Sequence, residues 1–510
     1  MNVQDFEKRF MNFENLVFKA DFLNTINDVS ECIYNMNHDI SILIFTDDND
    51  VDGISGAVID YLTLKQLGFH NIKIFGSNDR STIPNDANEF DLIITNDVGV
   101  NIDWNINTTS TIVVTDHHVK TIEHESQLNI YEIVMSNICG AYISYMLMSE
   151  LLSMYDFDVP FEEEDQTKKI KEVIYEFAIL ATIADCMPIN SLNHDNIQML
   201  YYKIQNSEIE ADALKIMLDE ILSSRFNTFD DETLSFYVIP KLNAPMKLNN
   251  SSTKTGEYFD INSNSNDWQL VMKFMINPDI NTYNIINQIN ENRKFEVTSI
   301  YQSIINELPK TKIDNVNNLT IFNGIGFKAR YTRHMIEINI PITSHITGLI
   351  ASKLTEYYGI PVVVNGNAFS SIRGDDSLEI LKLNSENLSA FGGHLQAAGF
   401  KLKPNQILNL DAYQPKQKLQ DKSNVVNWEP EFKFEIIKDW IFKNMPFTQK
   451  PLFKKEIIID KIRIFKNTHT KIFDTDGYEY MYFFKVLKLS HGDKMTITFK
   501  IGGSNIIIDQ

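Results

Sequence analysis

Three aspartates within five residues follow a short apolar run, and this feature constrains the fold more than any other. The run at 42–45 is typical of a buried strand, and directly after it come Asp48, Asp50 and Asp52, followed by Gly53. Carboxylates this close repel one another, and hard divalent cations relieve that repulsion. The pattern predicts a strand end that binds metal ions, with a solvated acidic turn as the alternative.

The same Asp-x-Asp-x-Asp-Gly pattern also begins the calcium loop of an EF-hand. That loop needs a bidentate Glu at its twelfth position and a helix before its first. Counted from Asp48, the twelfth residue is Ile59, and the preceding residues have the character of a strand. The EF-hand interpretation is therefore excluded.

Size and composition indicate a globular protein of several domains. The 510 residues are 43% hydrophobic, and no stretch approaches the roughly 20 apolar residues of a membrane span. The N-terminus has no signal-peptide pattern, and Cys32, Cys139 and Cys186 have no metal-binding spacing, so we expect a cytoplasmic protein. Abundant Asn, Ile and Lys indicate AT-rich codons, hence a low-GC bacterium or a virus of one. The net charge of −22 argues against a basic surface over the whole protein but allows a local basic groove.

Residues 1–235 read as a parallel α/β domain with a helical lead-in. Strands are predicted at 42–45, 72–75, 90–95 and 111–115, and helices at 54–67, 139–155 and 173–184. Sites in parallel sheets lie beyond the carboxyl ends of the strands. Asp97 follows the third predicted strand, and Asp116, His117 and His118 follow the fourth. We expect these side chains to converge with the aspartates after the first strand.

Asp185 is the last candidate metal ligand, and it directly follows the apolar helix predicted at 173–184. An ionisable side chain there needs a cap, a partner or a metal ion, and we interpret it as a ligand. So many carboxylates and imidazoles fit two metal ions about 4 Å apart, as used in phosphoester hydrolysis. The imidazoles favour Mn²⁺, with Mg²⁺ as the alternative.

The rest of the chain is predicted to contain four further segments. Residues 236–319 are a connector, with a loop at 238–246 because of its two prolines and a long helix at 285–308. Residues 320–403 are a smaller α/β domain, with strands at 333–340, 361–364 and 368–373 and a helix at 346–358. A polar linker at 404–426 precedes residues 427–510, whose alternating pattern predicts an OB-like β-barrel.

The motifs resemble those of the DHH phosphoesterase family. The resemblance rests on AspAsnAspValAspGly at 48–53, the isolated Asp97, AspHisHis at 116–118 and AlaThrIleAlaAspCysMetPro at 181–188. GlyGlyHis at 392–394 with AlaAlaGly at 397–399 is similar to the partner domain, DHHA1. Within the family, the segments 238–245, 348–354 and 445–453 are similar to RecJ-type exonucleases. That branch degrades single-stranded DNA 5′→3′ to mononucleotides in DNA recombination, repair and replication.

This resemblance implies a two-lobed clamp with two divalent metal ions in the first lobe and phosphate-binding residues in the second. The implied metal ligands are Asp50, Asp52, Asp97, His117 and Asp185, with Asp48 as an additional ligand. Of the implied catalytic residues, Asp116 would orient His117, and His118 would face the scissile phosphate. Substrate contacts are implied for Lys241, Asn243, Ser371, Arg373, Gly392, Gly393 and His394. The chain departs from the RecJ pattern at Lys241 and Lys247, where Arg is usual, at 194–196, and around Ser344 and His345.

Single-stranded DNA is the implied substrate, with a single-strand-binding protein or a helicase as candidate partners and no membrane. The C-terminal region adds a basic, aromatic stretch that predicts either a nucleic-acid track or a solvated barrel face. Its residues are Lys443, Phe447, Lys450, Phe453, Lys454, Lys455, Lys461, Arg463, Phe465 and Lys466. Two alternatives remain: a DHH phosphodiesterase of oligoribonucleotides or cyclic dinucleotides, and a non-catalytic replication scaffold. The first typically lacks the connector and barrel, and the second would have lost metal ligands, so the exonuclease is preferred.

Overall fold

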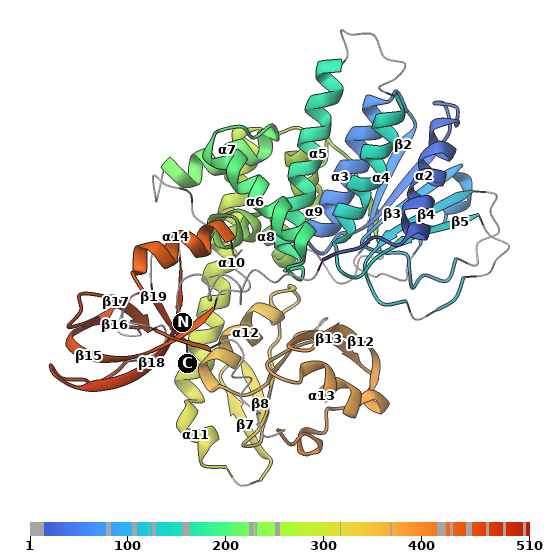
Figure 1. Cartoon of the computed structure of the whole chain (residues 1–510). Helices are drawn as coiled ribbons and strands as arrows, with labels where there is room; N and C mark the ends of the chain where they lie inside the picture. Colours follow the sequence, from blue (N-terminus) through green and yellow to red (C-terminus); the bar gives the residue numbers. More distant parts are fainter. Residues whose placement is uncertain are drawn as a thin grey trace.

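The computed structural model contains two lobes, a long helix that joins them, and a separate barrel (Figure 1). The structure describes residues 15–77, 83–104, 110–120, 122–124, 129–155, 164–223, 229, 232–249, 256–316, 318–367, 370–415, 425–428, 432–444, 451–465, 469–482, 486–502 and 506–509.

The first lobe is built on a six-stranded sheet in the order β5-β4-β3-β1-β2-β6. Its strands are β1 (Ile42–Asp47), β2 (Ile72–Ser77), β3 (Leu92–Asn96), β4 (Thr111–Asp116), β5 (Ile130–Val134) and β6 (Glu257–Tyr258). All neighbours pair in parallel except β2 and β6. The central β1 is fully buried, and its side chains alternate between two cores, with Ile42 and Ile44 on one side and Leu43 and Phe45 on the other. Burial on both faces explains its continuous apolar run, as is usual in parallel sheets.

Helices cover the sheet and extend the lobe (Figure 1). They are α2 (Ala20–Tyr34), α3 (Val51–Gln66), α4 (Gly140–Tyr155), α5 (Glu164–Ala184), α6 (Ser191–Gln205), α7 (Asp212–Ile221) and α9 (Trp268–Ile276). Helix α3 begins immediately after β1, and Asp50 caps it by accepting a hydrogen bond from the N–H of Asp52. A Cβ on Gly53 would lie 2.1 Å from the carbonyl oxygen of Asp47, so only glycine allows the helix to start so close to the strand.

The loop prediction at 238–246 is wrong, because these residues form most of helix α8 (Ile239–Asn249), which continues the π-helical turn η3 (Leu234–Val238). Pro240 lies in the first turn of α8, but Pro245 is inside the helix, where proline costs about 3 kcal/mol. Leu242 and Met246 are buried in the core of the lobe. Full burial contributes about 1.5–3 kcal/mol for each such side chain, which together outweighs the cost of the proline.

Helix α10 (Ile280–Glu307) joins the two lobes (Figure 1). Its 28 residues correspond to roughly 40 Å of helix. Asp279 caps its start by accepting hydrogen bonds from the N–H groups of Asn281 and Thr282. It contacts α8 in the first lobe and α12 (Thr347–Tyr358) in the second, and the short α11 (Lys310–Asp314) follows it. The long connector helix predicted at 285–308 is therefore present.

The second lobe contains a seven-stranded sheet in the order β12-β13-β11-β10-β9-β8-β7. Its strands are β7 (Thr320–Gly324), β8 (Phe327–Tyr331), β9 (Ile336–Asn339), β10 (Val362–Asn365), β11 (Ser370–Arg373), β12 (Leu388–His394) and β13 (Ala397–Leu402). Only β9 and β10 pair in parallel, and α12 is the crossover between them. Helix α13 (Ser377–Leu383) follows β11. The sequence predicted β9, β10 and β11 but missed the hairpin of β7 and β8, whose first strand is at most half-buried.

The C-terminal region forms a closed five-stranded barrel in the order β15-β16-β17-β19-β18, with β18 pairing back to β15. Its strands are β15 (Leu452–Phe465), β16 (His469–Asp474), β17 (Glu479–Tyr482), β18 (Lys494–Ile501) and β19 (Ile506–Asp509). Strand β14 (Val425–Asn427) pairs in parallel with the start of β15, and α14 (Phe434–Asn444) precedes the barrel. The long β15 pairs with β18 along its first half and with β16 along its second. The predicted fold class, two α/β lobes with a connector and a C-terminal OB-like barrel, is confirmed.

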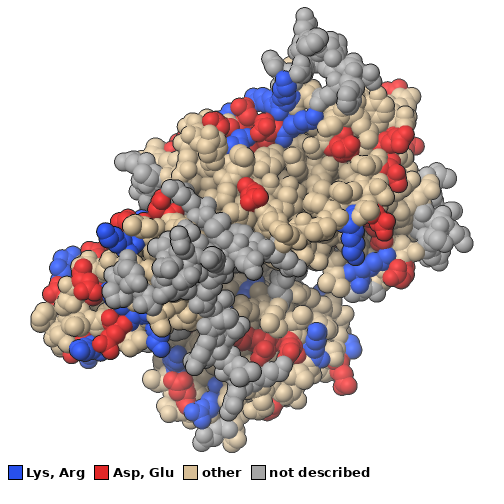
Figure 2. Space-filling model, in the orientation of Figure 1, with Lys and Arg blue, Asp and Glu red and all other residues tan. Residues whose placement is uncertain are grey.

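Acidic and basic side chains are interspersed over the face drawn in Figure 2. The negative net charge is therefore not gathered into one acidic surface on this face. Within the described part of the chain, no helix is long and apolar enough to cross a membrane.

Candidate metal centre

His117 lies at the centre of a cluster of acidic side chains. Its Nε2 is 3.1 Å from Oδ1 of Asp97, 3.6 Å from Oδ2 of Asp185 and 3.7 Å from Oδ2 of Asp52. Among the described residues, two overlapping groups have the ligand atoms to hold a metal ion: Asp97 with both histidines, and His117 with Asp52 and Asp185. In each group the atoms lie within 4.8 Å of one another. The structure thus brings together residues from four separate sequence motifs.

Asp52 is held in place by the start of helix α4. Its carboxylate accepts hydrogen bonds from the N–H groups of Gly140, at 2.9 Å, and Ala141, at 2.8 Å. These N–H groups and the helix dipole favour a negative charge at this point. A Cβ on Gly140 would lie 3.0 Å from both the Cα and the N of Asp97, so the glycine also allows α4 to pack against a second candidate ligand. The sequence interpretation missed this role, although a Gly-Ala pair at the start of the predicted helix was a usable signal.

Asp97 has an unusual backbone conformation at the end of β3. Its φ is +57°, in the left-handed region that aspartate tolerates better than most residues. Its N–H donates to the carbonyl of Thr115 on β4 at 3.0 Å. The strand therefore ends at Asn96, and the next side chain reaches His117 instead of following the pleat.

Asp116 contacts both of the histidines that follow it, and its side-chain contact is with His118. Its Oδ1 lies 2.7 Å from Nδ1 of His118 and accepts the backbone N–H groups of both histidines, while Oδ2 accepts the N–H of Val100. The cause is local geometry, because the chain turns sharply after β4 and wraps both N–H groups around this carboxylate. Burial alone would raise the pKa of Asp116, but the hydrogen bonds and charge of His118 and the N–H of Val100 lower it. This contact fixes the orientation of the His118 ring.

Burial and mutual repulsion act against the negative charges of this cluster. Burial raises the pKa of Asp52 to about 6, with repulsion from Asp97 adding to the shift. Burial and repulsion from Asp52 also raise the pKa of Asp185, whose buried Oδ2 accepts no hydrogen bond within the described residues. Burial opposes a charge on His117, yet Asp97, Asp52 and Asp185 raise its pKa to about 10. Carboxylate oxygens with imidazole nitrogens are a donor set that suits Mn²⁺ or Mg²⁺, so these residues fit a divalent metal.

The two remaining aspartates of the first motif lie differently. Asp50 caps α3 and adds to the negative potential that acts on Asp185. Asp48 is nearly buried, and burial with repulsion from Asp47, Asp267 and Glu257 raises its pKa to about 8. Neither belongs to the two metal-capable groups found among the described residues.

The second lobe reaches this end of the first sheet through the loop before α12. The N–H of His345 donates to the carbonyl of Lys247 at 2.7 Å, and Lys247 acts electrostatically on Asp48. Arg373 lies against the first turn of α12, because a Cβ on Gly348 would be 2.5 Å from its Nη2. Ser371 exchanges a hydrogen bond of 2.9 Å with Thr347 in the same turn.

Arg373 has no carboxylate within 4.0 Å among the described residues, and its Nη1 donates only to the carbonyls of Ile372 and Ala398. Burial lowers the pKa of this guanidinium. A half-buried cation without an acidic partner in the described part of the chain is suited to an anionic ligand.

The other predicted substrate contacts are placed as follows. Nζ of Lys241 lies 2.5 Å from the hydroxyl of Tyr283 and 4.9 Å from its ring centre. Oδ1 of Asn243 is buried and has no hydrogen-bond partner among the described residues. Gly393 has a φ of +129°, and a Cβ there would meet the carbonyl of Ala397 at 2.6 Å, so the β12–β13 hairpin itself requires this glycine. Gly392 is exposed, and the side chain of His394 lies outside the described residues.

The barrel carries a small basic and aromatic surface on β15 and β16. Lys461, Arg463 and Lys471 lie over the ring of Phe473 at 4.7, 5.5 and 5.6 Å, and Phe465 is 54% exposed. Other members of the predicted track have structural roles, because Phe453 is in the barrel core and Lys455 pairs with Asp474 and Asp476. Lys454 is exposed. The side chains of Lys443, Phe447, Lys450 and Lys466 lie outside the described residues.

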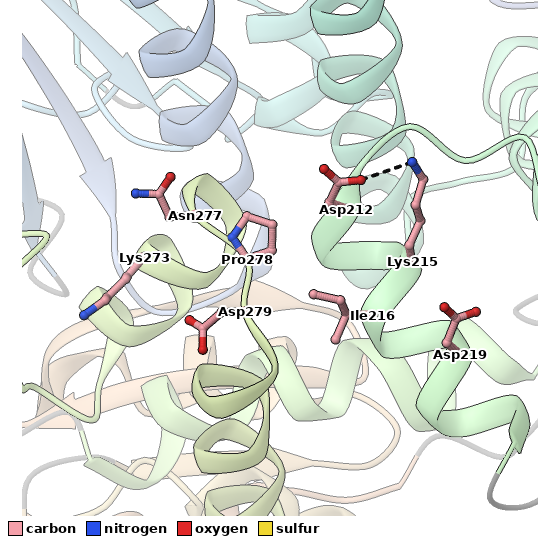
Figure 3. Close-up of a pocket in the computed structure, with 8 residues that line it drawn as sticks. All are labelled: Asp212, Lys215, Ile216, Asp219, Lys273, Asn277, Pro278 and Asp279. Carbon is pink, nitrogen blue, oxygen red and sulfur yellow. Dashed lines mark hydrogen bonds and ion pairs between the residues drawn. The ribbon is translucent and has the colours of Figure 1, made fainter.

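A surface pocket of about 750 Å³ lies away from this cluster, between α7 and the junction of α9 and α10 (Figure 3). Asp212 and Lys215 form an ion pair of 3.1 Å at its edge, and Asp279 is engaged in capping α10. It is lined by Asp212, Lys215, Ile216, Asp219, Lys273, Asn277, Pro278 and Asp279. Neither of the two metal-capable groups contributes to this lining.

Comparison with known proteins gives a domain family and a fold. Residues 41–182 match the sequence profile of the DHH family, N-terminal domain, and this part of the chain is a DHH-family domain. A search of curated proteins found no match.

Among solved structures, RecJ from Thermus thermophilus in complex with Mn²⁺ has a TM-score of 0.68 at 15% identity, over 99% of this chain and 72% of that chain. The structure of the same protein with Mg²⁺ has a TM-score of 0.60 at 15% identity, over 99% of this chain and 71% of that chain. The structure of an exonuclease RecJ bound to manganese has a TM-score of 0.53 at 16% identity, over 76% of this chain and 91% of that chain. The chain therefore has a RecJ-like fold over nearly its whole length, with an Asp/His cluster suited to metal in its DHH domain.

Proposed function

We propose that this protein is a metal-dependent exonuclease that hydrolyses single-stranded DNA from the 5′ end to mononucleotides. The observation that carries the proposal is the convergence of Asp52, Asp97, His117 and Asp185 around one point beyond the carboxyl ends of the first sheet. A scaffold has no need of a buried cluster whose like charges destabilise it. The direction of digestion and the preference for DNA rest on the likeness to RecJ-type exonucleases.

The residues of the cluster would hold two divalent ions, with Asp50 and Asp48 close enough in sequence to complete the set. Bound ions of this kind activate water and neutralise phosphate oxygens. His117 and the three aspartates would bind them, and Asp116 holds His118 so that Nε2 can donate to a phosphate or leaving-group oxygen. The similar RecJ structures with Mn²⁺ and with Mg²⁺ make both metals candidates here.

Two further surfaces support a polymeric substrate over a dinucleotide. Arg373, with no acidic partner among the described residues, would bind a backbone phosphate from the second lobe. The surface formed by Lys461, Arg463 and Phe473 combines positive charge with an aromatic ring, as single-strand binding requires. Phe465, at the exposed end of β15, would offer a stacking face to a base.

The decisive experiment is digestion in Mn²⁺ of 5′-phosphorylated, 3′-labelled single-stranded DNA, compared with duplex DNA, single-stranded RNA and a dinucleotide. An Asp97→Ala/His117→Ala double variant controls for contaminating nuclease. Asp212→Asn, which alters only the exposed ion pairs with Lys169 and Lys215 at the distant pocket, is the control for the protein preparation.

Loss of single-stranded DNA from the 5′ end by the wild type and Asp212→Asn, absent in EDTA and in the double variant, would support the proposal. Cleavage of the dinucleotide alone would refute the exonuclease proposal and indicate a phosphodiesterase of small substrates. Bound Mn²⁺ without cleavage of any substrate would refute autonomous nuclease activity and favour the scaffold.

A further inference from the structure

A buried network of polar side chains lies directly beneath the candidate metal centre. Nδ2 of Asn96 donates to Oδ2 of Asp60 at 2.8 Å and to Oγ of Ser144 at 2.9 Å. Oγ1 of Thr115 exchanges a hydrogen bond of 2.9 Å with the same Ser144 hydroxyl. All four side chains are 0% exposed. None of the four belongs to the candidate ligand set, so the network is a feature separate from the ligands themselves.

Each member of the network belongs to an element that carries or holds a candidate ligand. Asn96 immediately precedes Asp97, and Thr115 immediately precedes Asp116. Asp60 lies two turns after Asp52 in α3, and Ser144 lies one turn after Gly140 in α4. The network therefore ties the two helices and two strands together just behind the point where their ligands meet.

Room for Asn96 is created by a glycine on α3. A Cβ on Gly56 would lie 2.9 Å from Cβ and 3.2 Å from Nδ2 of Asn96. The amide is consequently held between the helix backbone and its two acceptors, and its plane is fixed. Asn96 is directly bonded to Asp97, whose left-handed φ of +57° is held in a sparsely populated backbone region.

The carboxyl group of Asp60 is not in a position where it would stabilise the folded protein. It has one hydrogen bond, and its other oxygen, Oδ1, is buried without a partner among the described residues. Burial raises its pKa to about 8. A group in this position costs folding free energy, whereas its acceptor atom still orients Asn96.

We propose that Asp60 is a positioning residue of the metal centre, which acts through the amide of Asn96 to fix the carboxylate of Asp97 against His117. The inference rests on the proposed metal-dependent function and extends it to residues outside the predicted ligand set. Groups that orient metal ligands from behind typically change metal affinity roughly 10–100-fold when removed.

The test measures Mn²⁺ affinity by EPR titration, at a temperature at which each metal-free variant is shown to be folded. Asp60→Ala removes the acceptor, and Asn96→Val removes the amide. Asp60→Asn keeps an oxygen acceptor in nearly the same place. Glu176→Ala is the matched control, since Glu176 is also a fully buried carboxyl of this lobe, where it accepts the N–H groups of Glu210 and Ala211.

Support would be Mn²⁺ binding weakened roughly tenfold in Asp60→Ala and Asn96→Val, with Asp60→Asn within about twofold of the wild type and Glu176→Ala unchanged. Wild-type affinity in Asp60→Ala, or equal weakening in Glu176→Ala, would reduce Asp60 to a structural residue and overturn the inference. If Asp60→Ala does not fold, the other two variants test the inference. Weakened Mn²⁺ binding in Asn96→Val with near-wild-type binding in Asp60→Asn supports it, and wild-type binding in Asn96→Val overturns it. If the wild type does not bind Mn²⁺, the proposed function is refuted, and the inference about Asp60 fails with it. This outcome is distinguishable from failure of the inference alone, because it is seen in the wild type without any variant.

Discussion

Replacing Asp60 by asparagine should stabilise the metal-free protein, and by an amount that depends on pH. Burial raises the pKa of Asp60 from 3.8 to about 8. When the pKa of an acid is higher in the folded state, the protein is most stable at a pH below the unfolded pKa. The free energy of unfolding then falls as the pH rises from the unfolded pKa to the folded pKa, and it levels off above the folded pKa. Each pH unit between these values costs about 1.4 kcal/mol, so at pH 7 the carboxyl costs about 4 kcal/mol.

Asparagine at position 60 removes this cost but adds an N–H₂ group. Its oxygen can still accept from Asn96, whereas an N–H₂ group left without an acceptor would cost about 1–3 kcal/mol. The net gain expected at pH 7 is therefore about 1–3 kcal/mol. For a lobe of this size that corresponds to a rise in Tm of roughly 2–10 °C.

Urea unfolding in EDTA at pH 4.5, 6, 7 and 8.5, followed by circular dichroism, measures the difference between Asp60→Asn and the wild type. The advantage of the variant should be smallest at pH 4.5, grow up to about pH 8 and then level off. Glu176→Gln is the control, since that buried carboxylate is paired with Lys203 and should lose stability on neutralisation. A difference that does not change with pH, or that favours the wild type more as pH rises, would refute the reasoning.

Three other predictions concern the cluster and the second lobe. The surrounding aspartates raise the pKa of His117 to about 10, so Mn²⁺ must displace a proton from this imidazole in order to bind. The affinity for Mn²⁺ should therefore rise by up to about tenfold for each pH unit between pH 6 and 8. An affinity measured by EPR titration that does not change with pH would contradict this. Gly140→Ala should reduce Mn²⁺ affinity and cost about 1–3 kcal/mol in urea unfolding, since the added Cβ would press on Asp97 at 3.0 Å, and unchanged affinity would argue against this packing. Arg373→Ala should raise KM for single-stranded DNA by about tenfold with little change in kcat, and Arg373→Lys by less; an effect on kcat alone would exclude simple phosphate binding.

Much of the first lobe could be predicted from local sequence. Buried parallel strands such as β1 are short apolar runs, and the polar residues that follow them stand at the carboxyl edge of the sheet, as Asp52 and His117 do. Strand β5 was missed because it is mostly half-buried and its pattern is weak. Helix α8 was mistaken for a loop because local rules weigh Pro245 fully, while the buried side chains around it become visible only in the folded lobe.

The sequence by itself determined which residues could bind metal, because aspartates and histidines have a recognisable ligand chemistry and follow recognisable strands. Only the tertiary structure decided how they are held. The hydrogen bonds of Asp52 to Gly140 and of Asn96 to Asp60 join residues 88 and 36 positions apart, and no local pattern encodes such pairs. The partner of Asp116 depended on how the chain turns after β4. Contacts of this kind arise when whole helices and strands pack, so they are set by the sum of many distant side chains.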